Sequence, residues 1–171
     1  MRIAGVIHES IVDGPGVRFV IFAQGCPHHC KGCHNEGTWD FSGGVEMTTR
    51  ALLKELHKSP SSIRGVTLSG GEPFSQPKEM AILAEKVHLL GLSVVTYTGY
   101  TYEELLEVAY TDQDVKQLLL ETDILVDGRY EEAYKDISLR FRGSSNQRVI
   151  NMNASRQANG IVLLATDTDK T

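Results

Sequence analysis

The stretch Gln24-Gly-Cys-Pro-His-His-Cys-Lys-Gly-Cys-His-Asn35 contains all three cysteines of the 171-residue chain. Cys26, Cys30 and Cys33 follow the spacing CxxxCxxC, and the sequence has no fourth cysteine. Cysteine thiolates are the usual ligands of iron–sulfur clusters, and a 4Fe–4S cluster normally takes four of them. Three neighbouring thiolates leave the fourth iron open, as a catalytic metal site keeps one position free. The stretch therefore indicates a 4Fe–4S cluster whose open iron binds a substrate.

Three other roles fit the cysteines less well than a cluster does: a disulfide framework, a zinc site and a buried structural role. A disulfide framework is disfavoured because the number of cysteines is odd and no secretory signal follows Met1. A structural zinc site is an alternative, with His28, His29 or His34 as a fourth ligand. We favour it less, because zinc knuckles usually pair two CxxC-like elements and this chain has one compact group. Buried structural cysteine fits least, because the neighbouring glycine, proline and histidine residues are typical of a loop.

Length and composition predict one domain spanning residues 1–171, with a polar tail from about residue 165. Hydrophobic residues make up 41% of the chain, which is enough for a core, and the formal net charge of −5 argues against a nucleic-acid partner. No apolar run approaches the roughly 20 residues of a membrane span, so we expect no membrane partner. Free thiols and the missing signal favour a soluble protein in a reducing, cytoplasmic setting.

The strand before the cysteine stretch is the clearest element. Residues 17–23 are short, β-branched or aromatic and almost entirely apolar, which is typical of a buried strand. Apolar spacing, caps and turn residues predict helices at about 48–58, 77–90 and 112–121, and one that begins at 101. The same signals predict strands at 3–7, 64–68, 92–97 and 123–126, and two further strand-like runs at 139–151 and 160–164.

The order strand, loop, helix repeats at least three times and predicts an α/β protein with parallel strands and helical crossovers. In such sheets and barrels, functional residues gather in loops at the carboxyl ends of strands. The cysteine loop and the motifs SGGEP, YTGY and DGR all lie at such ends. Because the chain is shorter than the ~250 residues of a full eight-unit barrel, we expect a partial, open (β/α) barrel.

The SGGEP motif places Gly70, Gly71 and Glu72 just past a predicted strand. Glycine has no side chain, so its backbone N–H and C=O groups can touch a ligand closely. The Glu72 carboxylate can accept hydrogen bonds from an ammonium group. An ordinary turn is the alternative; beside an open iron, the motif gains weight as the seat of an amino acid.

The DGR motif offers a second pair of candidate ligand-binding side chains. Asp127 supplies a hydrogen-bond acceptor, and Arg129 supplies a planar fork that suits a carboxylate or a ribose hydroxyl. A surface turn with no ligand contact accounts for the motif equally well, so both interpretations stay open at this point.

Together these motifs resemble a known family. CxxxCxxC with SGGEP at residues 69–73 resembles the radical S-adenosylmethionine superfamily. The block IVDGPGVRF at residues 11–19, which runs into Gln24-Gly-Cys26, resembles the glycyl-radical activating enzymes within it. One branch, the activating proteins of anaerobic (class III) ribonucleoside-triphosphate reductases, is similar over residues 3–151. The segments that carry this closer likeness are CHN at 33–35, TWDF at 38–41, YTGY at 97–100, DILVDGR at 123–129 and LRFRGSSNQR at 139–148.

The resemblance implies an oxidoreductase with two cofactors, a 4Fe–4S cluster and S-adenosylmethionine. The methionyl amino and carboxylate groups of S-adenosylmethionine would chelate the open iron. A flavodoxin or ferredoxin-like donor would supply an electron, and cleavage would give a 5′-deoxyadenosyl radical. That radical would take a hydrogen atom from one glycine of the partner reductase. The cofactors carry this chemistry, and the protein positions them and excludes water.

The resemblance also implies residue roles. Cys26, Cys30 and Cys33 would be the catalytic cluster ligands. The residues expected to contact S-adenosylmethionine are Gly32, Cys33, His34, Gly70, Gly71 and Glu72, with Asp127 and Arg129 as further candidates. Two alternatives within the superfamily remain, an activase of another glycyl-radical enzyme and an enzyme acting on a small molecule, as the 7-carboxy-7-deazaguanine synthases do. The zinc-binding interaction module is the alternative outside it.

Overall fold

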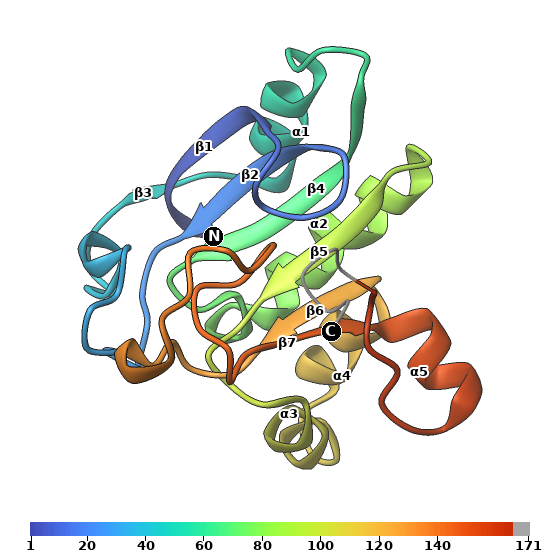
Figure 1. Cartoon of the computed structure of the whole chain (residues 1–171). Coiled ribbons are helices and arrows are strands. Elements are labelled where there is room, and N and C mark those ends of the chain that lie inside the picture. Colours follow the sequence, from blue (N-terminus) through green and yellow to red (C-terminus); the bar gives the residue numbers. More distant parts are fainter. Residues whose placement is uncertain (166–171) are drawn as a thin grey trace.

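The computed structural model describes residues 1–165, and the predicted polar tail, residues 166–171, lies outside them. A seven-stranded sheet has the order β3-β1-β2-β4-β5-β6-β7 (Figure 1). The strands are β1 (Arg2–Ser10), β2 (Val17–Ala23), β3 (Val45–Glu46), β4 (Ile63–Gly70), β5 (Ser93–Tyr97), β6 (Ile124–Asp127) and β7 (Arg148–Asn151). The α-helices are α1 (Thr49–His57), α2 (Pro77–Leu89), α3 (Tyr102–Ala109), α4 (Gln113–Leu120) and α5 (Met152–Ala158).

The centre of the sheet is parallel, as predicted. Strands β2, β4, β5 and β6 pair in parallel, while β1, β3 and β7 add antiparallel strands at the two sides. Parallel strands need covered faces, which explains why β2 is almost entirely apolar and buried. The α/β class is confirmed and the sheet is open; the partial-barrel form stays a prediction.

The two faces of the sheet are covered differently. Successive strand residues point to opposite faces, so Val94 packs into the main core with helices α1 to α4, whereas Val95 joins a smaller apolar group with Phe141. Figure 1 shows the orange segment ahead of β7 crossing the sheet on the side away from α2. The loop that precedes β7, and not a helix, therefore covers this part of the second face.

Local signals determine the helix starts. The Thr48 hydroxyl caps α1 by accepting a hydrogen bond from the Ala51 amide. Thr101 and Glu104 form the predicted capping box of α3. No helix within residues 1–165 combines the length and apolar character needed to cross a bilayer.

The strand predictions for residues 139–151 and 160–164 were wrong in extent. Only the last four residues of the run 139–151 form a strand, and the run 160–164 contributes a single bridge between Leu163 and Ile150. The reason is local: the Gln147 side-chain oxygen accepts hydrogen bonds from the amides of Gly143 and Ser144. These amides are then unavailable to a strand ladder, and the segment folds as an irregular loop.

Candidate active site

The cysteine loop leaves the carboxyl end of β2 and closes on itself. The Gly25 amide donates to the Thr38 carbonyl over 2.7 Å, and the Cys26 amide donates to the Trp39 carbonyl over 3.2 Å. The Gln24 side-chain amide ties the loop further by donating to the Asp40 carbonyl over 2.7 Å. These bonds hold the backbone on both sides of the cysteines, so the thiols sit on a defined loop although it contains no long helix or strand.

The three cysteines line one cavity of about 240 Å³. Cys26 is buried, and Cys30 and Cys33 are half-buried. Burial raises the pKa of both the Cys26 and the Cys30 thiol, so these two are protonated at neutral pH in the metal-free protein. Metal binding must therefore release protons, as it does in other thiolate sites. The Asn35 amide donates to the Cys33 sulfur over 3.3 Å, which ties this side chain to the backbone of the loop.

The predicted glycine loop forms the opposite wall of this cavity. Gly70 and Gly71 both line it. A Cβ on Gly71 would lie 2.4 Å from the Gly25 carbonyl oxygen, and a Cβ on Gly70 would lie 2.6 Å from the backbone of Phe22. The Gly71 amide also donates to the Ala23 carbonyl over 2.7 Å. Glycine is required here because the loop packs directly on the backbone that leads into the cysteines.

Glu72 is hydrogen-bonded to protein groups from several loops. Its side chain is fully buried, and its two oxygens already accept hydrogen bonds from the Phe74 amide, the Thr98 hydroxyl and the Gly99 amide. A further bond of 2.7 Å joins its Oε2 to His28 Nε2. Its role as a ligand of an ammonium group stays a prediction, and its visible role is to tie loops together.

Other predicted site residues are spread around the cavity. His34 lines it, with its ring edge against Tyr130 at 5.4 Å between centroids. Gly32 has a φ of 77° and lies behind, where a Cβ would be 3.2 Å from Glu132. The predicted cofactor contacts of Gly32, Cys33 and His34 stay predictions.

The DGR pair is engaged with protein groups. Asp127 is buried and forms a bidentate ion pair with Arg148, which also bonds Glu103. Arg129 is about half exposed and lies 3.5 Å from Glu104. Only Gly128 of this motif lines the cavity. Ligand contacts by Asp127 and Arg129 stay predictions, and the structure gives both side chains structural partners.

Several cavity residues were not singled out as site residues from the sequence. They are Asp13, Trp39, Ser69, Thr98, Gly99, Gly128, Tyr130, Gly143 and Gln147. All of them except Tyr130 lie in segments that carried the family resemblance, so this likeness was the available signal. Their placement depends on the fold, because they come from loops after different strands.

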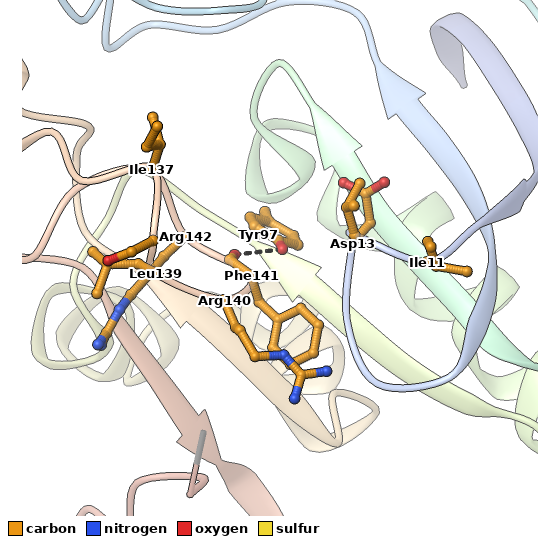
Figure 2. Close-up of a pocket in the computed structure, with 11 residues that line it drawn as sticks. Ile11, Asp13, Tyr97, Ile137, Leu139, Arg140, Phe141 and Arg142 are labelled. Atoms are coloured by element: carbon orange, nitrogen blue, oxygen red, sulfur yellow. Dashed lines mark hydrogen bonds between the residues drawn. The ribbon is translucent and has the colours of Figure 1, made fainter. Parts of the chain in front are cut away.

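A second, larger groove of about 510 Å³ adjoins the first cavity and shares Asp13, Tyr97 and Gly143 with it. Figure 2 shows Ile11 and Asp13 on one side and the segment from Ile137 to Arg142 on the other, with Tyr97 donating to the Phe141 carbonyl between them. Ile11 is 73% exposed and Ile137 is 93% exposed. Exposed apolar side chains therefore line the groove that adjoins the cysteine cavity.

The donor set fits an iron–sulfur cluster better than a single zinc ion. Within residues 1–165, no three His, Cys, Asp or Glu side chains are placed to hold one metal ion. Two of the three candidate histidines are otherwise engaged: His28 bonds Glu72, and His29 stacks on Trp39 at 4.6 Å. A cluster suits thiols spread around a cavity, because each thiolate binds a different iron.

Comparisons with known proteins agree with this chemistry. The family described as a 4Fe-4S single cluster domain matches residues 12–150. Proteins named anaerobic ribonucleoside-triphosphate reductase-activating protein are similar over most of their length. The one from Vibrio cholerae is 35% identical over 81% of this chain and 90% of its own. The one from Enterobacteria phage T4 is 37% identical over 82% and 87%, and the one from Escherichia coli K12 is 34% identical over 82% and 92%.

Among solved structures, the crystal structure of QueE from Escherichia coli matches 58% of this chain and 53% of its own, with 20% identity and a TM-score of 0.47. This likeness is too low to support an argument on fold or function. The identity and coverage of the curated relatives, together with the cluster-domain match, decide the family. The chain belongs to the family of anaerobic ribonucleoside-triphosphate reductase-activating proteins.

Proposed function

We propose that this protein activates an anaerobic ribonucleoside-triphosphate reductase by generating a glycyl radical on it, with a 4Fe–4S cluster and S-adenosylmethionine as cofactors. The observation that carries the proposal is the single cavity lined by all three cysteines and by Gly70 and Gly71. It lies at the carboxyl edge of the parallel strands, where α/β proteins bind their ligands. The family of the chain supplies the substrate, a reductase.

The residues have separable tasks in this proposal. Cys26, Cys30 and Cys33 would hold three irons of the cluster and leave one iron free for the amino and carboxylate groups of S-adenosylmethionine. Gly70 and Gly71 would present backbone groups to the methionine end, because no side chain keeps the ligand away. The bound cluster would supply one electron for cleavage of S-adenosylmethionine into methionine and a 5′-deoxyadenosyl radical, and that radical would take a hydrogen atom from a glycine of the reductase.

Two aromatic side chains in the cavity lining pack against histidines of the cysteine loop. His29 stacks flat on Trp39, with 6° between the ring planes. Tyr130 contacts His34 edge-on. Access to this cavity matters for the proposal, because a reactive radical must meet the partner glycine before it meets solvent.

The finer predictions of the sequence complete the proposal. We infer that the chain is one domain over residues 1–171, that the parallel strands form a partial, open barrel, and that the protein works in the cytoplasm. A flavodoxin or ferredoxin-like protein donates the electron. Support for a reducing compartment comes from the three free thiols, which are the ligands the cluster needs.

The groove of Figure 2 is the best candidate for reductase contact. Whatever segment carries the reactive glycine must reach the cysteine cavity, and this groove opens into it through Asp13, Tyr97 and Gly143. Exposed Ile11 and Ile137 give apolar area at its rim. Apolar side chains around a cavity mouth are typical of protein-binding surfaces.

Anaerobic reconstitution with iron and sulfide tests the proposal. The reduced protein should give the electron paramagnetic resonance signal of a 4Fe–4S cluster, and adding S-adenosylmethionine should change that signal. With the reductase present, a glycyl radical signal should follow. One zinc and no iron or sulfide would refute the cluster, and turnover of a small molecule without a protein radical would refute activation of a reductase.

A further inference from the structure

A buried histidine lies between the first two cluster cysteines and bonds a buried carboxylate. The side chains of His28 and Glu72 are 4% and 0% exposed, and 2.7 Å separates Nε2 from Oε2. Because a carboxylate is an acceptor, Nε2 is the donor of this bond. The two residues are 44 positions apart in the sequence, so the contact joins the cysteine loop to the SGGEP loop across the edge of the sheet.

The remaining hydrogen bonds of Glu72 extend this connection to a third loop. Its Oε1 accepts from the Phe74 amide over 3.0 Å and from the Thr98 hydroxyl over 2.9 Å, and its Oε2 accepts from the Gly99 amide over 2.8 Å. Thr98 and Gly99 follow β5. The carboxylate therefore holds together the ends of β2, β4 and β5, and its hydrogen-bonding capacity is taken up by protein donors.

The imidazole of His28 is also confined by packing. A Cβ on Gly99 would lie 2.4 Å from the His28 ring, so this position accepts only glycine. The Tyr100 ring stands edge-on to the imidazole at 4.5 Å between centroids. The ring thus has one position available, and the backbone between Cys26 and Cys30 follows it.

We propose that His28 is a positioning residue: by bonding Glu72 it sets the three thiols against Gly70 and Gly71, so that a bound cluster faces the cofactor-binding loop. In this arrangement Glu72 acts as the internal tie of three loops. The identity of the cofactor in this inference rests on the proposed function. The arrangement of the loops around His28 and Glu72 is independent of the proposed function.

The energetic reason is that removing His28 leaves the buried Glu72 carboxylate with one donor fewer. The Glu72 carboxylate would then draw in water or pull Thr98 and Gly99 to a new position, because an unsatisfied buried carboxylate is costly. Partners behind metal-site residues typically change metal or cofactor affinity by about 10- to 100-fold when removed. We expect that range for S-adenosylmethionine affinity.

The test compares His28→Leu, which removes the donor, with His28→Gln, which keeps an N–H. The matched control is His88→Leu, because His88 also bonds two carboxylates but lies at the other edge of the sheet. The first readout is amide hydrogen exchange at Gly71 and Gly99 in the metal-free protein. The second is the dissociation constant of S-adenosylmethionine from the reconstituted, reduced protein.

His28→Leu should speed exchange at Gly71 and Gly99 by about tenfold or more and weaken cofactor binding by about 10- to 100-fold. His28→Gln should restore most of both, and His88→Leu should change neither, even if it lowers the melting temperature as much. Wild-type exchange rates in His28→Leu would overturn the inference. So would equal effects of the two leucine variants.

The two hypotheses fail in different ways. If wild-type protein assembles no cluster or ignores S-adenosylmethionine, the proposed function fails, and exchange in the metal-free variants still decides the role of His28. If the cluster forms and the cofactor binds equally well in His28→Leu, the positioning role fails and the proposed function stands.

Discussion

Two histidine–carboxylate clusters lie at opposite ends of the parallel strands of the same sheet. We call the side where these strands end the carboxyl edge and the side where they begin the amino edge. At the carboxyl edge, His28 bonds Glu72, and both side chains are almost fully buried. At the amino edge, His88 lies between Glu121 and Asp123, at 2.6 and 2.7 Å, and its side chain is 31% exposed. The first cluster borders the cysteine cavity, and the second joins the ends of α2 and α4 to the start of β6.

The contrast shows that a histidine–carboxylate hydrogen bond can have two different roles, depending on the end of the strands at which it lies. The loops at the carboxyl edge carry the groups that meet ligands, so a bond there decides where thiols and glycines lie. The bonds at the amino edge connect elements whose positions matter only for packing. Disturbing the first cluster should therefore change function more than stability, and disturbing the second should do the reverse.

The largest expected effect is the loss of a cluster thiol at the carboxyl edge. Cys30→Ala should reduce S-adenosylmethionine cleavage and glycyl radical formation to background, because two thiolates remain where three are needed. Cys30 is only half-buried, so the melting temperature of the metal-free protein should move by at most a few degrees. Iron analysis, radical quantitation and thermal unfolding measure the three quantities.

The exposed Ser61 provides the control for handling of the protein, and Ser61→Ala should assemble the cluster normally. Substantial radical yield from Cys30→Ala would contradict the assignment of this thiol. A collapse of stability in the metal-free variant would contradict the separation of the two edges.

The next largest effect belongs to the amino edge. Arg18 at the start of β2 is 1% exposed, and it donates to the Val66 carbonyl over 2.8 Å and to the Ser93 hydroxyl over 2.8 Å. Burial lowers its pKa to about 10, which still leaves it charged at neutral pH. Arg18→Met should cost about 3 kcal/mol of unfolding free energy, because hydrogen bonds from a charged donor are lost inside the protein.

Urea unfolding of the metal-free protein measures this loss, and exposed Arg50→Met should stay within about 0.5 kcal/mol of wild type. Below the unfolding transition, Arg18→Met should bind S-adenosylmethionine as wild type does. Weakened binding by the folded variant would show that the amino edge also sets the site, and the comparison would fail.

A smaller effect is expected at the groove beside the cavity. Ile137 is 93% exposed, so Ile137→Lys should leave the fold unchanged and raise the KM for the reductase about tenfold, or about 1.4 kcal/mol. Cofactor cleavage without the reductase should be unaffected. Leu89→Lys is the matched control, because Leu89 is 73% exposed at the end of α2. Equal KM values for both variants would place the reductase elsewhere.

The contrast also explains how far the sequence alone could lead. The strand at residues 17–23 and the helix starts at Thr48 and Thr101 were predicted because their signals are local: an apolar run and capping residues. The cysteine and glycine loops were predicted at the carboxyl ends of parallel strands, which lie together in such a sheet, and in the structure both loops line one cavity.

Contacts between distant residues were beyond prediction. The bond between His28 and Glu72 spans 44 positions, and nothing near either residue announces it. The same holds for Asp127. Nothing in the sequence indicated a partner for its carboxylate, which forms an ion pair with Arg148, 21 positions away. The strand prediction for residues 139–147 was wrong for another reason. The Gln147 side chain accepts the hydrogen bonds of backbone amides that were expected to pair with a neighbouring strand.

The smallest expected effect is a pH-dependent loss of stability at the amino edge. Burial by itself lowers the pKa of His88, but hydrogen bonds to Asp123 and Glu121 outweigh it and hold the pKa above 6.5. The stabilisation is therefore complete below pH 6.5 and is lost as the pH rises through the folded-state pKa. Asp123 sets the lower end of this pH range. Burial raises the pKa of Asp123, but hydrogen bonds led by the one to His88 outweigh burial and hold the pKa below 3.8. The stabilisation contributed by Asp123 is therefore lost only as the pH falls through that lowered pKa. His88→Gln should cost about 1 kcal/mol at pH 5.5 and less at pH 8.5, by urea unfolding. A difference that grows with rising pH would refute this role of His88.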